Sequence, residues 1–234
     1  MAKRQKRNRH QDFNPTLDLV ADNPSRYVRN ITAMNTHQTQ FIESLTHNPI
    51  TIAAGPAGTG KTYLACVQAA EALMRGEVES IIITRPAISS ASEDLGYLPG
   101  SLENKLNPFL KPCIQVLSQR LSRQRFSHFV KEGRIEFASF AHMRGRTFNN
   151  AFIIADEVQN LNVDAMKMLL TRLGFNSRMV LCGDLSQTDL PLGVASGLAD
   201  AIERLQASEH VGVINFTDED VVRSPVVADI LAKY

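Results

Sequence analysis

A glycine-rich segment that ends in lysine and threonine has the residue types and spacing to bind a phosphate. Its sequence, "GPAGTGKT", matches the pattern G-x-x-x-x-G-K-[ST] in full. In this pattern the glycines let successive backbone N–H groups face phosphate oxygens, and the following helix adds its positive end. The alternative is a glycine-rich turn with a surface lysine. We predict a nucleotide-binding P-loop made of Gly55, Pro56, Ala57, Gly58, Thr59, Gly60, Lys61 and Thr62.

The chemistry beyond phosphate binding depends on an acidic pair in "FIIADEVQN", residues 152–160. Lys61 would reach the β- and γ-phosphates, and Thr62 would offer its hydroxyl to Mg²⁺. Asp156 is then expected to hold Mg²⁺ through water, and Glu157 to orient or deprotonate the attacking water. The alternative is that both acids merely charge the start of the next helix.

A third polar group follows another apolar run, in "RMVLCGDLSQTDLP", residues 178–191. Asp184 ends the run and Gln187 comes three positions later. An amide there can bond the γ-phosphate or the attacking water and so report whether the nucleotide is intact. Because Gly-Asp also begins many turns, the motif indicates a sensor only together with the two motifs before it.

The elements that must position these motifs alternate between strands and helices. Apolar runs predict strands at 49–54, 80–85, 134–139, 151–156, 178–183 and 211–216, and helical patterns fit 61–75, 162–173, 193–206 and 225–233. Several of the strands are apolar throughout, as strands covered on both faces are. This order predicts an α/β fold, a mostly parallel, doubly wound sheet with helices on both faces. Ligands bind at the carboxyl ends of such strands, where all three motifs lie.

The chain divides into an arm and one domain. We expect residues 1–34 to form a basic, partly disordered N-terminal arm and residues 35–234 to form the P-loop domain, with 86–133 as a helical and loop insertion over the edge of the sheet. The stretch "KRQKRNRH" carries five Lys or Arg and no acid. It is either a nucleic-acid contact or a solvated tail.

Composition excludes several classes of protein. The net charge of the 234 residues is +1, which produces no global field for a polyanion. Cys66, Cys113 and Cys182 are widely spaced and form no CxxC pair, so we expect reduced, buried thiols. No apolar run approaches a membrane span of roughly 20 residues, and the N-terminus lacks the apolar stretch of a signal peptide. We expect a cytoplasmic protein with no membrane partner.

The motifs in their order resemble those of the PhoH-like family. The resemblance covers roughly residues 35–234 and is carried by "GPAGTGKTYLA", "TRPA", "LGYLPG", "MRGRTF", "DEVQN", "MKMLLTRLGF", "GDLSQTDLP" and "DVVRSPVV". It implies a RecA-like core similar to the nucleotide-binding half of superfamily 1 helicases, with ATP as the nucleotide. It also implies that Gln38 reads the adenine edge, as the Q motif of helicases does.

Two positions depart from the family pattern. Asp94 stands where the family more often has lysine, which weakens any phosphate or nucleic-acid role for that position. Val158 replaces the usual alanine of the acidic motif, a change too small to affect chemistry.

The resemblance also implies roles for family arginines at positions 85, 144, 146, 172 and 223. Arg223 could stabilise the γ-phosphate of its own site or of a neighbouring subunit, or form a salt bridge with the acids at 218–220. Arg144 and Arg146 flank a glycine and suit phosphate or RNA contacts, although a solvated loop fits as well. Arg85 belongs to the same group of candidate nucleic-acid or trans-phosphate contacts.

Together the motifs predict Mg²⁺-dependent ATP binding and hydrolysis, with Lys61, Glu157, Gln187 and Arg223 as catalytic residues. A helicase needs two RecA-like faces around each nucleotide, and this chain has room for one. We therefore expect a homo-oligomeric ring, a hexamer, that acts on RNA or single-stranded DNA. The alternatives are an ATP-binding switch with little hydrolysis and a small P-loop kinase, against which Glu157 argues.

Overall fold

The computed structural model describes residues 31–86, 102–222 and 226, and only the backbone of 102–109. Several sequence predictions lie outside these residues: the basic arm up to residue 30, the role of Arg223, the departure at Asp94 and nearly all of the helix expected at 225–233. In the described part of the chain, no helix is long and apolar enough to cross a membrane.

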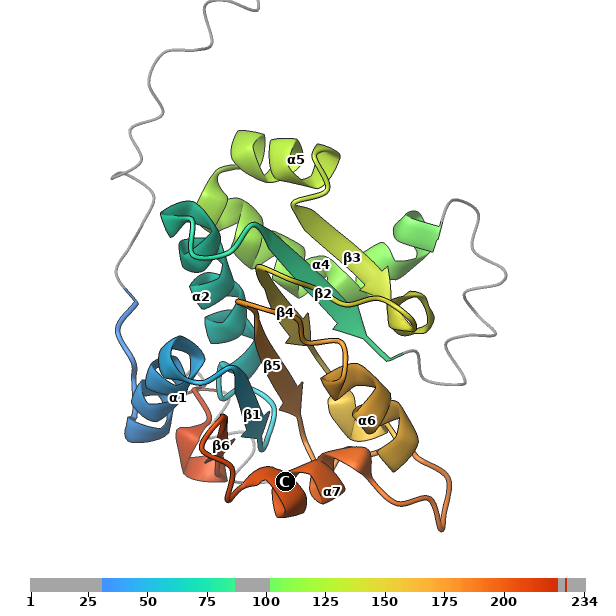
Figure 1. The fold of residues 1–234 in the computed structure, drawn as a ribbon. Helices are drawn as coiled ribbons and strands as arrows, with labels where there is room; N and C mark the ends of the chain where they lie inside the picture. Colours follow the sequence, from blue (N-terminus) through green and yellow to red (C-terminus); the bar gives the residue numbers. More distant parts are fainter. Residues whose placement is uncertain (1–30, 87–101, 223–225, 227–234) are drawn as a thin grey trace, which may run out of the picture. The chain divides into compact units, whose positions relative to one another are not determined.

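A six-stranded, all-parallel sheet forms the centre of the fold (Figure 1). Its strands are β1 (Ile50–Ala54), β2 (Ser80–Arg85), β3 (Ile135–Ser139), β4 (Ala151–Ala155), β5 (Arg178–Gly183) and β6 (Val211–Asn215). Their order across the sheet is β3-β2-β4-β5-β1-β6. The predicted α/β fold is confirmed, and the sheet has no antiparallel strand among the described residues.

The central strands are buried because helices cover both faces of the sheet. Every residue of β4 is buried, and so are five of the six residues of β5, in the pattern iBBBBB. Strands buried on both faces need apolar side chains at consecutive positions, which explains why their sequences show no alternation.

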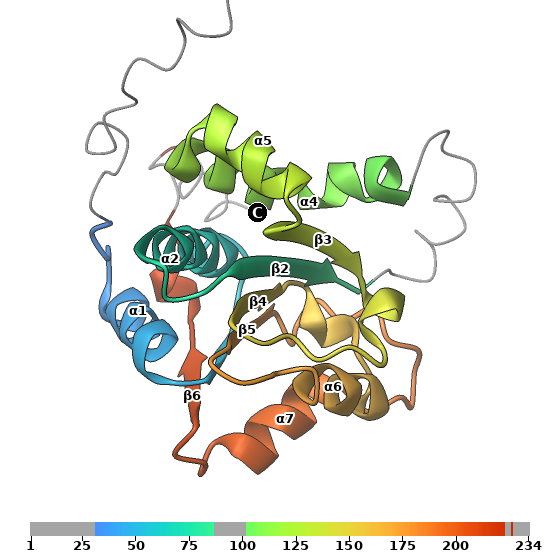
Figure 2. The same cartoon turned by 45° about the horizontal axis from the view of Figure 1, so that its top comes forward.

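One face of the sheet is covered by α1 (Thr36–His47), α2 (Lys61–Arg75) and α4 (Leu102–Leu121), as Figure 2 shows. Helix α5 (Arg123–Lys131) follows α4 and contacts β3, the strand at the edge of the sheet. Gly76 caps the carboxyl end of α2 in a left-handed backbone conformation, and its N–H donates to the carbonyl of Leu73 at 3.2 Å.

The opposite face is covered by α6 (Val163–Leu170) and α7 (Gly197–Leu205). Both helices are shorter than the predicted spans 162–173 and 193–206. Helix α6 ends before residue 173 because the segment after it pairs with Phe148. Leu173 forms a β-bridge with Phe148, and the N–H of Gly174 donates to the Phe148 carbonyl at 2.9 Å. Helix α7 starts late because Ser196 caps it by accepting a hydrogen bond from the N–H of Ala199.

Short 3-10 turns complete the described structure: η2 (Phe140–Met143), η3 (Val158–Asn160) and η4 (Asp218–Asp220). Turn η3 follows β4 after Asp156 and Glu157, and η4 follows β6 after Phe216 and Thr217. These turns lie where strands of the parallel sheet end, so they shape the edge that carries the motifs.

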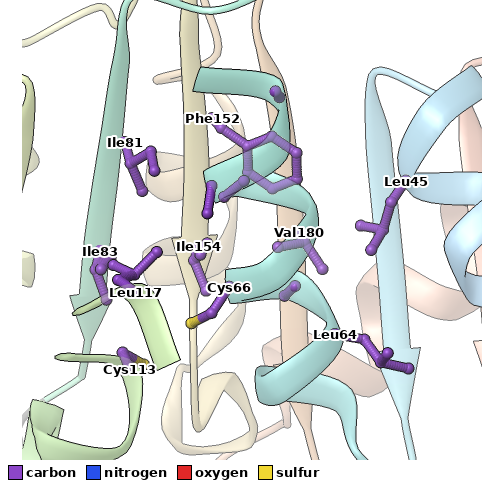
Figure 3. Packing of buried hydrophobic residues seen from close by; sticks show 14 of the residues in the cluster. Leu45, Leu64, Cys66, Ile81, Ile83, Cys113, Leu117, Phe152, Ile154 and Val180 are labelled. Carbon is purple, nitrogen blue, oxygen red and sulfur yellow. The ribbon is translucent and has the colours of Figure 1, made fainter. Parts of the chain in front are cut away.

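The core below this edge joins the sheet to α2 and α4. Figure 3 shows Cys66 of α2 beside Ile154 of β4, with Cys113 and Leu117 of α4 nearby. The prediction of reduced, buried cysteines is confirmed, because all three cysteines are free and buried. Helix α4, which lies in the segment expected as an insertion over the edge of the sheet, therefore contributes to the main hydrophobic core.

We predict that Leu117→Ala lowers the free energy of unfolding by about 2–5 kcal/mol, because the leucine is fully buried and its loss leaves a cavity. Urea denaturation measures the change. The matched control is Leu192→Ala, at a fully exposed leucine, which should shift the same quantity by less than about 0.5 kcal/mol. Equal, small effects would show that α4 does not belong to the core.

Candidate active site

The carboxyl ends of β1, β4 and β5 meet at one edge of the sheet and enclose a pocket of about 260 Å³. Its lining residues come from all three motifs: Ala57, Gly58, Gly60, Lys61, Thr62, Tyr63, Asp156, Glu157, Gly183, Asp184 and Gln187. The β1 and β5 ends are tied by a hydrogen bond of 3.0 Å from the N–H of Gly55 to the carbonyl of Gly183. Segments far apart in sequence thus share one cavity.

The P-loop has the backbone of an anion cradle. Gly55, Gly58 and Gly60 all have positive φ, at 140°, 87° and 88°. A side chain at Gly55 would also meet the carbonyl oxygen of Phe216 at 2.4 Å, so only glycine fits there. Gly60 precedes α2 and offers no capping side chain, which leaves the first N–H groups of α2 for a ligand. The loop fits a nucleotide phosphate.

Lys61 is folded against this loop. Its Nζ donates to the carbonyls of Gly55 and Pro56 at 2.7 and 2.8 Å. Burial lowers the pKa of Lys61, although the carboxylates of Asp184 and Asp156 act in the opposite direction. The ammonium group thus lies inside the cradle, on main-chain carbonyls that a phosphate would replace.

Thr62 and Asp156 join the P-loop to the end of β4. The Thr62 hydroxyl donates to Asp156 Oδ1 at 2.8 Å. Burial raises the pKa of Asp156, and the hydrogen bond from Thr62 opposes this shift. A hydroxyl and a carboxylate are hard oxygen ligands of the kind that Mg²⁺ prefers, so the pair fits this ion.

Glu157 is held in a constrained position after β4. Its backbone is left-handed, with φ of 57°, which is uncommon for a residue with a side chain. Oε1 lies 3.1 Å from Nη2 of Arg85, and Oε2 accepts a hydrogen bond of 2.6 Å from Nε2 of Gln159. Both carboxylate oxygens are therefore engaged by other side chains of the site.

Gln159 is a site residue that the sequence analysis did not single out. It is 1% exposed, and its Nε2 also reaches the carbonyl of Gln187 at 3.2 Å. Its Oε1 accepts from the N–H of Asp184 at 3.1 Å. The signal was present in "DEVQN", where an amide follows the acidic pair by two positions. Gln159 links the Glu157 carboxylate to the segment that carries Asp184 and Gln187.

The predicted sensor is itself bonded into a turn. Gln187 donates from Nε2 to Asp184 Oδ2 at 2.8 Å, and the Ser186 hydroxyl donates to Asp184 Oδ1 at 2.7 Å. Asp184 is buried, whereas Gln187 is exposed and lines the pocket. The amide is thus positioned by Asp184 at the mouth of the cavity.

Gln38 lies beneath the P-loop, at 4% exposure. Its Nε2 donates to the carbonyl of Thr59 at 2.9 Å, and its Oε1 accepts from the N–H of Met34 at 2.8 Å. Both polar ends of the side chain are used inside the protein, where they brace the loop. The adenine contact implied by the resemblance stays a prediction.

The arginines lie in different surroundings. Arg146 pairs with Glu136 at 2.5 and 2.7 Å and lies over the ring of Phe148. Arg172 donates to the carbonyl of Arg146 at 2.8 Å and so supports that loop. Arg144 is exposed.

Two further observations concern the surroundings of the P-loop. The N–H of Val222, the last described residue before Arg223, bonds the carbonyl of Gly58 at 3.0 Å. Tyr63, a pocket residue that sequence reasoning missed, is half exposed.

Comparison with known proteins identifies the family. A family model described as PhoH-like protein matches residues 30–234. The chain belongs to the PhoH-like family. It is 46% identical over 197 residues to the PhoH-like protein of Bacillus subtilis and 43% identical over 212 residues to protein PhoH of Escherichia coli K12. These alignments cover 84% and 90% of this PhoH-like chain but only 61% and 60% of the two relatives.

A PhoH-like protein of Synechocystis is 42% identical over 229 residues, covering 98% of this chain and 68% of the relative. Among solved structures, the Pif1 helicase of Candida albicans matches 80% of this chain and 41% of its own, with a TM-score of 0.40 and 16% identity. That likeness is too slight to bear on the function of the PhoH-like site.

We predict that Asp156→Asn raises the melting temperature of the nucleotide-free protein near about pH 8. Because burial raises the pKa of Asp156, its charged form costs the folded state free energy above that pKa, and the cost is relieved as pH falls through it. The difference from wild type should therefore shrink on acidification. Calorimetry measures it, and Asp189→Asn, at an exposed acid, is the control. A lower melting temperature for Asp156→Asn would contradict the prediction.

We predict that Gln159→Ala lowers the free energy of unfolding by about 1–3 kcal/mol, because it leaves the buried N–H of Asp184 without its acceptor. The matched variant Gln119→Ala, at an exposed glutamine of α4, should change the free energy of unfolding by less than about 0.5 kcal/mol. Urea denaturation compares the two variants. If Gln159→Ala had as small an effect as Gln119→Ala, Gln159 would have no structural role.

Proposed function

We propose that the protein binds ATP with Mg²⁺ and hydrolyses it. The observation that carries this proposal is that a P-loop lysine, the bonded pair Thr62 and Asp156, and Glu157 line one pocket. A phosphate cradle alone would support binding only. A carboxylate beside the metal ligands adds a candidate base, and family membership agrees with a P-loop nucleotide-binding protein.

In the proposed mechanism each residue acts at a defined place. The N–H groups of the P-loop and Lys61 bind the β- and γ-phosphates, once the Nζ of Lys61 leaves the carbonyls of Gly55 and Pro56. Mg²⁺, held by Thr62 and through water by Asp156, would neutralise charge on the phosphates. Glu157 orients the attacking water and accepts its proton on the carboxylate, and Gln187 bonds the γ-phosphate and reports its loss.

We further propose that the protein works as a ring, with a hexamer as the expected assembly, and acts on RNA or single-stranded DNA. Two arginines support the nucleic-acid part of the proposal. Arg85 ends β2, the strand that pairs with β4, and Arg144 follows the turn η2 after β3 and is exposed. Arginine suits phosphate because its planar group offers paired donors. The arm at 1–34 adds basic charge in the sequence.

We predict that Lys61→Ala abolishes Mg²⁺-dependent ATP binding, whereas Glu157→Gln keeps binding and lowers kcat by about 10²–10⁴-fold. The reason is that Lys61 contacts the phosphates and Glu157 acts only in the reaction. Calorimetric titration with ATP and an assay of phosphate release measure the two effects. Lys167→Ala, at an exposed lysine of α6, is the control.

Wild-type protein that released no more phosphate than Lys61→Ala, with and without RNA, would overturn the hydrolytic function. If that protein still bound ATP in a single-turnover assay without cleaving it, the ATP-dependent switch would take its place.

The assembly is tested separately. Light scattering with ATP and Mg²⁺ is expected to give the mass of a hexamer, because one RecA-like face cannot enclose the nucleotide. A monomer at every concentration, with and without ATP, would remove the ring from the proposal.

A further inference from the structure

An ion pair connects the candidate base to the neighbouring strand. Arg85 ends β2 and Glu157 follows β4, and these strands pair directly, with Thr84 opposite Ala155. The Nη2 of Arg85 lies 3.1 Å from Glu157 Oε1, while Oε2 is held by Gln159. Each carboxylate oxygen can accept about two hydrogen bonds, so these two contacts leave Glu157 fewer acceptor sites for a water molecule. The pair therefore holds the Glu157 carboxylate in a resting position.

The pair is open to competition from solvent. The side chain of Arg85 is 27% exposed and that of Glu157 is 34% exposed. Ion pairs at such exposure contribute little to stability and are screened by salt. An anion with stronger hydrogen-bond geometry can therefore take Arg85 from Glu157 without disturbing the core.

Arg85 also belongs to a basic edge, which we define as Arg85 and Arg144; Arg146, in the same loop as Arg144, is held by Glu136. Arg85 pairs in register with Ser139, the last residue of β3, and Arg144 follows the turn η2 after that strand. Arg144 is exposed and, within the described residues, has no ion pair with an acid. Phosphates spaced along a strand could bind this edge at more than one point, which favours a polyanion over a single phosphate ion.

We propose that Arg85 and Glu157 form a latch that the phosphodiester backbone of single-stranded nucleic acid opens. A backbone phosphate binds Arg85 on the basic edge, and Glu157, released from Arg85, becomes available to the attacking water. Nucleic acid thereby regulates the hydrolytic site without entering the nucleotide pocket. The hydrolytic consequence rests on the proposed function, but the competition for Arg85 does not.

The competition is tested by binding, with no hydrolysis involved. Fluorescence anisotropy measures the affinity for a labelled oligouridylate without nucleotide at low salt. Because the oligonucleotide and the Glu157 carboxylate compete for Arg85, Glu157→Gln should bind the oligonucleotide at least about three times more tightly than wild type. Arg85→Ala should bind more weakly, and Arg85→Ala with Glu157→Gln should show none of the gain.

A matched variant separates competition from net charge. Glu209→Gln removes the same charge just before β6 begins, at the opposite end of the parallel strands, and should leave the affinity near that of wild type. The same measurement with an oligothymidylate shows whether the protein binds the phosphodiester backbone that both oligonucleotides share or requires the ribose of RNA. The latch would be overturned if wild type and Glu157→Gln bound the oligonucleotide equally tightly. It would also be overturned if Glu209→Gln, or the double variant, gained as much affinity as Glu157→Gln.

The regulatory consequence is tested by kcat for ATP hydrolysis. Wild type should be stimulated by oligouridylate, whereas Arg85→Ala should have a raised basal kcat and no further stimulation. If Arg85→Ala instead lowers the basal kcat and leaves the KM for ATP unchanged, Arg85 is part of the catalytic machinery and the latch is overturned. If wild type hydrolyses no ATP, the proposed function fails. The binding experiment still decides whether the oligonucleotide and the Glu157 carboxylate compete for Arg85.

Discussion

The hydrogen bond between Thr62 and Asp156 joins positions 94 residues apart and depends on the parallel sheet. Parallel strands end at the same edge, so the loop after β1 and the acids after β4 come within reach of each other. Strand β5 lies between them and brings the segment of Asp184 to the same place. The contacts between the P-loop, the acidic pair and the Asp184 segment follow from this shared edge.

Below the edge, two buried glutamines hold the loops in place. Gln38 bonds the carbonyl of Thr59 in the P-loop, and Gln159 bonds both Glu157 and the backbone of Asp184. Loops built from glycines and exposed backbone have little stability of their own, and buried amides can satisfy donor and acceptor groups together. The residues that would contact a nucleotide are thus supported by residues that do not line the pocket.

The candidate site places charged side chains in buried positions, where each charge costs free energy. Burial lowers the pKa of Lys61 and raises that of Asp156, so the charged form of each group costs free energy in the free protein. A bound phosphate and its metal would oppose both shifts, because each charge would gain a partner. Glu157 adds a left-handed backbone. Such features lower the stability of the free protein and suit a site that is completed by its ligand.

Sequence alone determined the strands, the P-loop, the acidic pair and the fold class, because apolar runs and glycine spacing are local properties. It misjudged the ends of α6 and α7, where pairing with Phe148 and capping by Ser196 decide the helix limits. Only the tertiary structure revealed Gln159 as the link to Asp184 and Arg85 as the partner of Glu157. These contacts join separate strand ends, and no local pattern encodes which side chains meet across a sheet.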